Sequence, residues 1–204
     1  TCATSVTATD MREIKVSGIV VGGEDAGEAD RLVRLLTPDG MMTVRMRGVK
    51  KEKAKLKFAA MPFSLCEYVL LKRGAYYSVK TAEQAGSFFG VTSSPEKYIV
   101  GSVMLECASA AAGADSADIF FDLLSALKRL VYSDVHPYSI GLNFVYRLLV
   151  RGGYIAPSPR DAEYNVGIDL QQSLPPDRAK RLLRAYLSLF ENKFYVKLKA
   201  AGSL

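Results

Sequence analysis

The chain of 204 residues, with a mass of 22.3 kDa, is long enough for one large domain or for two small ones that share an interface. Hydrophobic residues make up 49% of it and charged residues 24%, so a packed core is expected, and the net charge of +6 favours a polyanionic partner. Three scattered cysteines and one histidine exclude a zinc site of paired ligands and argue against a disulfide framework.

The same features predict a protein of a reducing cytoplasm. No apolar run reaches the roughly 18 to 20 residues that a membrane span needs. Residues 1–10 have neither the basic nor the apolar stretch of a signal peptide. The isolated cysteines, Cys2, Cys66 and Cys107, suit a reducing compartment. We expect no cofactor, no metal ion and no catalytic residue.

Five short runs of β-branched, aromatic and alternating apolar residues predict strands in the first part of the chain. The predicted strands are 14–21, 31–36, 41–47, 63–71 and 76–81. In the third strand, the alternation places Met42, Val44 and Met46 toward a core and Thr43, Arg45 and Arg47 toward solvent. Five strands of this length favour a small barrel of the OB type, and a sandwich fits the pattern nearly as well.

Turn signals separate these predicted strands. Gly22 to Asp25 is expected to end the first strand, and Pro38-Asp39-Gly40 predicts a tight turn after the second. Lys72-Arg73-Gly74-Ala75 predicts a hairpin turn between the last two strands.

Further along the chain the apolar residues recur with the period of a helix. Four helices are predicted, over 98–112, 117–132 and 139–150 and after Pro175-Pro176. Ser116 is expected to cap the second helix, and Gly152-Gly153 to end the third. Residues 155–173 have little periodicity and are expected to form a loop.

The change of period divides the chain into two predicted domains. The first, residues 1–86, is a five-stranded OB-type β-barrel, and the second, residues 87–204, is an all-α domain with a C-terminal helix and tail. The predicted fold class is therefore α+β, with strands and helices segregated along the chain.

One stretch carries a charge equal to that of the whole chain. Seven basic residues and one acidic residue, Glu52, fall between positions 45 and 57 and give a net +6. The basic residues are Arg45, Arg47, Lys50, Lys51, Lys53, Lys55 and Lys57, with Arg31 and Arg34 as possible neighbours. Such a concentration favours contact with phosphate backbones. The spacing of two from Lys51 to Lys57 would place the amines on one side of an extended segment that tracks a nucleic-acid strand.

Two alternatives stay open at this stretch. The lysines would also suit a solvated loop that aids solubility. Tyr68, Tyr76 and Tyr77 would offer stacking platforms for bases, or would be wall residues of the barrel with wet hydroxyls.

An ordered set of motifs resembles the RecO family. The most specific is Arg47-Gly48-Val49-Lys50-Lys51 followed by Met61-Pro62-Phe63-Ser64, which is similar to the family's "KGARR…LQPF" run with Arg47 in place of its Lys. The other matching segments, in order, are Val16–Val20, Gly27–Val33, Leu35–Gly40, Tyr98–Glu106, Phe120–Leu130, Phe144–Tyr154 and Arg181–Leu204.

The resemblance implies an OB domain, a helical domain and no covalent chemistry. RecO proteins bind single- and double-stranded DNA and anneal complementary strands. They recognise the C-terminal tail of single-stranded-DNA-binding protein and, with RecR, help load RecA recombinase in DNA repair. For this chain the resemblance implies a nucleoid-associated recombination mediator. The alternative is an adaptor that docks RecR and the tail peptide, with incidental DNA affinity; a nuclease would need a metal-binding carboxylate set.

The chain also departs from the family pattern. Many members carry a four-cysteine zinc module after the "GY" motif, whereas residues 155–174 contain no cysteine, so the chain resembles a variant without that module. Leu142 and Asn143 stand where some members have paired arginines. A substitute pocket for an acidic, Phe-ended peptide is predicted from Lys128, Arg129, Tyr132, Tyr146 and Arg147, against the alternative of an ordinary helix surface.

Four further features are expected to be structural. His136 lacks a partner carboxylate or nucleophile and is interpreted as a capping or surface residue. Gly22-Gly23 lacks the spacing of a nucleotide loop, and the acidic residues between Asp25 and Asp30 lack that of a calcium loop. Cys107 is expected in the core.

Three lysines near the C-terminus leave a choice. Lys193, Lys197 and Lys199 would either extend a DNA path across the helical domain or form a frayed basic tail.

Overall fold

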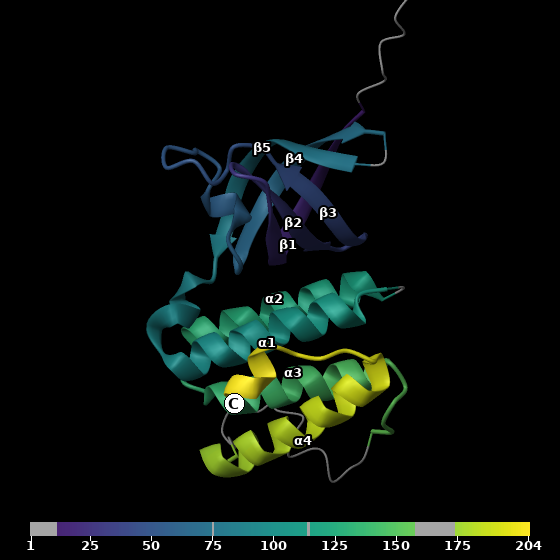
Figure 1. The fold of residues 1–204 in the computed structure, drawn as a ribbon. Helices are drawn as coiled ribbons and strands as arrows, with labels where there is room; N and C mark the ends of the chain where they lie inside the picture. The colour runs from purple at the N-terminus through teal and green to yellow at the C-terminus, as the bar shows by residue number, and fades with distance from the viewer. Residues whose placement is uncertain (1–11, 75, 114, 158–173) are drawn as a thin grey trace, which may run out of the picture.

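A five-stranded barrel stacks on a bundle of four helices in the computed structural model, which describes residues 12–74, 76–113, 115–157 and 174–204 (Figure 1). The strands are β1 (Glu13–Ala26), β2 (Asp30–Thr37), β3 (Gly40–Met46), β4 (Ser64–Arg73) and β5 (Tyr76–Ser87). Their order around the closed barrel is β1-β2-β3-β5-β4, with β4 paired back to β1. All pairs are antiparallel except the short parallel β3–β5 pair. This is the OB-type barrel expected from the sequence, and the sandwich alternative is excluded.

The first strand does not end where the sequence predicted. β1 continues through Gly22-Gly23-Glu24-Asp25 to Ala26, and a bulge between Val20 and Gly22 absorbs the irregularity. A Cβ at Gly23 would lie 2.6 Å from the carbonyl oxygen of Leu32 on β2. The glycines therefore allow close approach of two strands instead of breaking one.

The alternation predicted for the third strand is confirmed. Val44 and Met46 are buried and Met42 is half-buried, whereas Thr43, Arg45 and Arg47 are exposed. The turn at Pro38-Asp39 is also present before β3. The hairpin turn between β4 and β5 contains Gly74 with a positive φ of 61°; Ala75 lies outside the described residues.

Each end of the barrel is closed by apolar side chains. At one end, Val49, Leu56 and Ala59, from the segment after β3, join the barrel core. At the other end, Ile19 and Phe63 belong to the core that the helices form. The interior of the barrel is therefore filled, and its outer wall is left for contacts with other molecules.

The helices form two layers beneath the barrel (Figure 1). α1 (Pro95–Ala111) and α2 (Ser116–Tyr132) lie next to the strands, and α3 (Pro137–Arg151) and α4 (Pro176–Phe194) lie on the far side. Short 3-10 helices span Phe58–Ala60, Phe89–Ser93 and Ala200–Ser203. No helix among the described ranges is long and apolar enough to cross a membrane.

Three helix-end predictions can be compared with this geometry. Ser116 is wrong as the cap of α2, because it is the first helical residue and its hydroxyl donates back to the Gly113 carbonyl. His136 caps α3, since its Nδ1 accepts from the backbone N–H of Tyr138. α3 ends as predicted, with Gly152 at its C-cap and Gly153 at a φ of 71°.

The C-terminal segment returns along the helices after α4. Tyr195 ends α4 in the left-handed conformation, and Leu198 and Leu204 are buried again. Cys107, which was expected in the core, is fully buried on α1, and this burial raises the pKa of its thiol. The predicted loop at 155–173 lies almost wholly outside the described residues. The domain boundary at residues 86–87 stays a prediction, since one apolar core includes residues from both sides of it.

Candidate nucleic-acid interface

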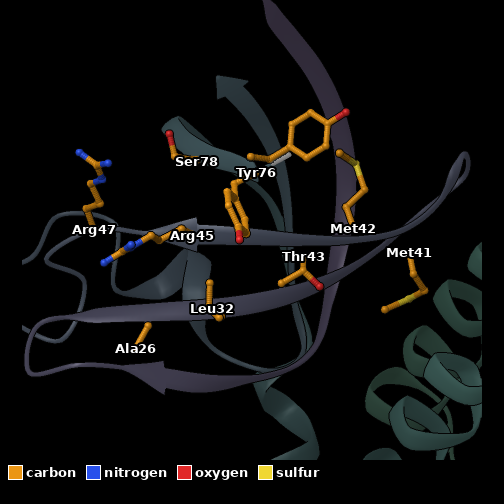
Figure 2. A pocket seen from close by; sticks show the side chains of 10 residues that line it. Ala26, Leu32, Met41, Met42, Thr43, Arg45, Arg47, Tyr76 and Ser78 are labelled. Carbon is orange, nitrogen blue, oxygen red and sulfur yellow. The ribbon is translucent and has the colours of Figure 1, made fainter. Parts of the chain in front are cut away.

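A groove of about 730 Å³ lies on the outer wall of the barrel, where β2, β3 and the start of β5 meet. Its lining is largely apolar and includes two methionines and two tyrosines; the residues are Ala26, Leu32, Met41, Met42, Thr43, Arg45, Arg47, Tyr76, Tyr77 and Ser78. Figure 2 shows Arg45 and Arg47 at one end of this groove and Met41 and Met42 toward the other. The groove thus joins a cationic end to an apolar floor.

Arg45 is held in place by a carboxylate of the neighbouring strand. Its Nη2 lies 2.8 Å and its Nε 2.9 Å from Oδ2 of Asp30, at the start of β2. The other oxygen of Asp30 accepts the backbone N–H of Gly48 at 2.8 Å. The Gly48 amide, followed by Arg45, lowers the pKa of Asp30 below its usual value, so the carboxylate stays ionised at neutral pH.

Lys50 is paired in a similar way with the end of β1. Its Nζ lies 2.7 Å from Asp25 Oδ2, and its backbone N–H donates to the carbonyl of Ala29 at 3.0 Å. The hydrogen bond from Lys50 lowers the pKa of Asp25. These bonds tie the segment after β3 to the β1–β2 turn, so the two acidic residues have the structural use that was expected of them.

The lysine-rich segment is not extended, which corrects the sequence prediction. Backbone hydrogen bonds from Lys51 to Gly48, from Ala54 to Lys51 and from Lys57 to Ala54 fold it into successive turns. The turns direct Val49 and Leu56 into the barrel core, while the lysines remain exposed on the outside of the turns. Among the described residues no carboxylate forms an ion pair with Arg47, Lys51, Lys53, Lys55 or Lys57.

Two side chains of β4 fix the end of this segment. The Ser64 hydroxyl donates to the carbonyl of Phe58, and the Tyr68 hydroxyl donates to that of Ala59, both at 2.7 Å. Tyr68 is 1% exposed, and its burial raises the pKa of its phenol. Tyr68 is therefore a core residue of the barrel: it offers no stacking platform, and its hydroxyl is bonded to Ala59 where a wet hydroxyl was the alternative. Tyr76, by contrast, is 76% exposed at the groove.

The two arginines of β2 lie across the glycine pair of β1. A Cβ at Gly22 would lie 2.7 Å from Nη2 of Arg34, and a Cβ at Gly23 would lie 3.2 Å from Nε of Arg31. Arg34 also reaches toward the helices, with its Nη1 3.4 Å from the hydroxyl of Ser109 on α1. Neither arginine lines the groove itself.

A second hollow, of about 470 Å³, lies where β5 meets the end of α2. It brings together Lys128, Arg129 and Tyr132, three of the five residues predicted for a peptide pocket, beside Leu65 and Phe88. Burial, followed by the nearby charge of Arg147, lowers the pKa of Arg129.

The other two predicted peptide residues do not line this hollow. Tyr146 is buried and packs edge-on against Tyr186 of α4. Arg147 pairs with Asp122 on α2 at 2.6 Å. The structure therefore gathers only part of the predicted set.

Sequence reasoning missed part of the groove's apolar lining. Leu32 and Met41 contact the groove, although only the charged neighbours were predicted as site residues. The signal was present, because Met41 shares the outward side of β3 with Thr43 and Arg45. Within the described ranges there is no group of three or more His, Cys, Asp or Glu residues that would hold a metal ion.

Comparisons with known proteins find similarity to one family. Residues 11–88 match the family model described as "Recombination protein O N terminal". A DNA repair protein RecO from Acetivibrio thermocellus is 27% identical over 153 residues, covering 71% of this chain and 59% of the relative.

RecO proteins from two further organisms are also similar. The one from Heliobacterium modesticaldum is 30% identical over 147 residues, 71% of this chain and 53% of the relative. The one from Dehalococcoides mccartyi is 32% identical over 125 residues, 60% of this chain and 49% of the relative. The chain thus spans about three-fifths or less of the length of these relatives. Residues 11–88 therefore match the RecO N-terminal domain, and the chain over most of its length is similar to RecO proteins.

Proposed function

We propose that this protein is a non-enzymatic DNA-binding mediator of DNA repair and recombination, and that it binds DNA on the outer wall of its barrel. The observation that carries the proposal is the groove on β2 and β3, which has Arg45 and Arg47 at one end and the exposed lysine turns beside it. OB barrels take oligonucleotides on this face. The similarity to proteins named for DNA repair supports the same role.

The two parts of this surface would bind different parts of the nucleic acid, because they differ in charge and shape. Lysines that have no carboxylate partner within the described ranges, such as Lys51 and Lys53, would bind phosphates through release of counterions. The apolar floor with Met41, Tyr76 and Tyr77 accepts bases that have left the stack. A duplex keeps its bases stacked inside, so it would use the cationic rim alone.

Binding to fluorescent oligonucleotides across a series of salt concentrations tests the proposal. Lys51→Ala with Lys53→Ala should flatten the dependence of log affinity on log salt by about 1 for each phosphate that the protein no longer neutralises. The matched control is Arg181→Ala with Lys193→Ala, which removes the same charge from exposed positions on α4. An equal change in both variants, or none in either, would remove the lysine turns from the proposed binding surface.

Strand annealing is the activity that this surface would support. A cationic wall lowers the repulsion between two phosphate chains and raises their local concentration, so annealing needs no catalytic side chain. We expect the protein to accelerate pairing of complementary strands coated with single-stranded-DNA-binding protein, and to act with RecR in loading RecA. Arg45→Ala with Arg47→Ala should slow the annealing. An unchanged annealing rate would mean that these groove residues take no part in annealing.

The second hollow favours a second candidate function, that of a docking adaptor. Lys128 and Arg129 beside Tyr132, Leu65 and Phe88 combine positive charge with an apolar lining, which suits an acidic peptide with an aromatic end. The occupant would be the tail of single-stranded-DNA-binding protein. Lys128→Glu should weaken capture of that peptide and leave oligonucleotide binding unchanged. Tight peptide capture by a protein with negligible DNA affinity would make docking the main role.

A further inference from the structure

The barrel groove continues across β2 toward β1. An adjoining hollow of about 340 Å³ shares Leu32 and Thr43 with the groove and is also lined by Arg34 and Lys199. A further hollow, of about 370 Å³, shares Arg34 and Lys199 with this adjoining hollow and runs along residues 196–199 and α1. The three hollows therefore adjoin one another in a row from the barrel wall to the C-terminal segment.

Arg34 stands at the junction between the barrel and the helices. It is the register partner of Gly22 on β1 and of Thr43 on β3. Because Gly22 has no side chain, the guanidinium lies across β1 toward Ser109 of α1. No ion pair joins Arg34 to a carboxylate within the part of the chain that the structure describes. Its charge is thus available to a ligand in either hollow.

Lys199 is presented from a backbone that is fixed on both sides. The N–H of Leu198 donates to Glu191 at 2.8 Å, and that of Ala200 donates to Glu106 at 3.2 Å. The buried side chains of Leu198 and Leu204 anchor the same segment. These contacts argue against a frayed tail, which was the alternative for these lysines.

The charges of the row suit a phosphate chain. Lys199 and Lys197 are exposed, and the pair between Lys197 and Glu191 is long, at 3.3 Å, with the lysine side chain 87% exposed. Glu106 and Glu191 already accept backbone N–H groups, so both carboxylates hold the segment in place. Glu24 is the remaining acidic residue that lines the row.

We propose that one single strand of nucleic acid runs along this row, with its next phosphates bound by Arg34, Lys197 and Lys199 after it leaves the barrel groove. The inference rests on the proposed function and deepens it, because it gives the path that the strand takes beyond the barrel. It also assigns a binding role to the C-terminal segment.

Two oligothymidylates of different length test the path, one of about 6 nucleotides, which fits a single OB face, and one of about 20, which extends beyond it. Lys197→Ala with Lys199→Ala should weaken binding of the longer strand by about 5- to 20-fold at low salt and reduce its salt slope by about 1 to 2. Binding of the shorter strand should stay within about twofold of that of the wild type. The control is again Arg181→Ala with Lys193→Ala, since neither residue lines the row.

Each other outcome overturns the inference in an identifiable way. Unchanged binding of the longer strand would take the C-terminal segment off the path. If the variant lost equal affinity for both strand lengths, or if the control lost as much affinity as the variant, the loss would be explained by the change of net charge alone. The proposed function is tested separately by Arg45→Ala with Arg47→Ala, which should weaken binding of the shorter strand. If that variant binds as the wild type does, the barrel site fails whatever the C-terminal lysines do.

Discussion

Two cations on the barrel wall already have carboxylate partners, while their neighbours do not. Arg45 is paired with Asp30 and Lys50 with Asp25, whereas Lys51 and Lys53 have no such pair within the described ranges. A phosphate that approaches Arg45 must compete with Asp30, so this arginine contributes less to binding than its position suggests. The competing carboxylate also anchors Gly48, and thereby the start of the lysine turns.

Replacing Asp30 should therefore strengthen DNA binding. In Asp30→Asn the amide oxygen still accepts the Gly48 N–H, but the negative charge opposite Arg45 is removed. We expect a rise of about 3- to 10-fold in oligonucleotide affinity at low salt and a salt slope steeper by about 1, measured by fluorescence anisotropy. Asp39→Asn, at the exposed turn before β3, removes the same charge from a residue that forms no ion pair within the described ranges, and is the control. An equal gain in both variants would attribute the effect to net charge.

The same pair gives a defined dependence of stability on pH. Because folding lowers the pKa of Asp30, its contribution to stability is present above the ordinary aspartate pKa of about 3.9 and is lost as the pH falls through the lower folded value. Urea denaturation should find the wild type more stable than Asp30→Asn at about pH 6. The difference should shrink as the pH falls below about 3.9 and close once Asp30 is protonated in the folded protein; a difference that persists after that protonation would assign the effect to shape instead of charge.

At the scale of elements, the strands were largely predictable and the connections were not. Alternation in β3 and the turn at Pro38-Asp39 follow from local preferences that the sequence displays directly. The lysine spacing of two is the spacing of a strand, so it predicted an extended segment. The segment instead folds into turns, because Val49 and Leu56 pack their apolar side chains into the barrel core. Gly22 suggested a strand break because its role cannot be seen from its own neighbours in the chain. The space where its side chain would lie is filled by Arg34, which comes from another strand.

The site shows the same limit. Charge density alone located the cationic end of the groove, since charge is a property of sequence. Its continuation past Arg34 depends on where the C-terminal segment returns, which only tertiary packing decides. Packing also decides the two predicted peptide residues on α3, since Tyr146 packs against Tyr186 of α4 and Arg147 pairs with Asp122 of α2.

Tyr68 should matter to the lysine turns because its hydroxyl donates to the carbonyl of Ala59, just after them. Tyr68→Phe removes the hydrogen bond to the buried Ala59 carbonyl and should lower the free energy of unfolding by about 1 to 3 kcal/mol. Tyr76→Phe, whose hydroxyl is exposed, should change it by less than about 0.5 kcal/mol. Urea denaturation of both variants is the measurement. Equal stability of the two would mean that water satisfies the carbonyl.

For the whole molecule, Phe63 joins the barrel to the helices. Its N–H donates to Val20 on β1 and its carbonyl accepts from Phe88, both across short distances of 3.2 and 3.1 Å. Its ring packs edge-on against Tyr98 of α1, with centroids 6.1 Å apart. Its φ of 68°, unusual for a bulky residue, shows that packing outweighs backbone preference at this joint.

Truncating this side chain should uncouple the two parts. Phe63→Ala should lower the free energy of unfolding by about 3 to 5 kcal/mol, and hydrogen exchange should then show β1 and α1 opening at different free energies. Phe121→Ala, on the exposed side of α2, should cost less than about 1 kcal/mol and keep the two protected together. If hydrogen-exchange protection of β1 and of α1 fell by the same amount in Phe63→Ala, the rest of the shared core would suffice to couple the barrel to the helices.

The filled barrel has a kinetic consequence. Since Val49 and Leu56 close one end and Phe63 the other, a strand meets a wall that is already in its final shape and has no chamber to enter. Association should then be governed by diffusion and steering, with a rate constant above about 10⁷ M⁻¹s⁻¹ at low salt that falls steeply as salt is added. Stopped-flow mixing at rising protein concentration should show a rate that increases linearly without reaching a plateau, because no slow opening precedes contact.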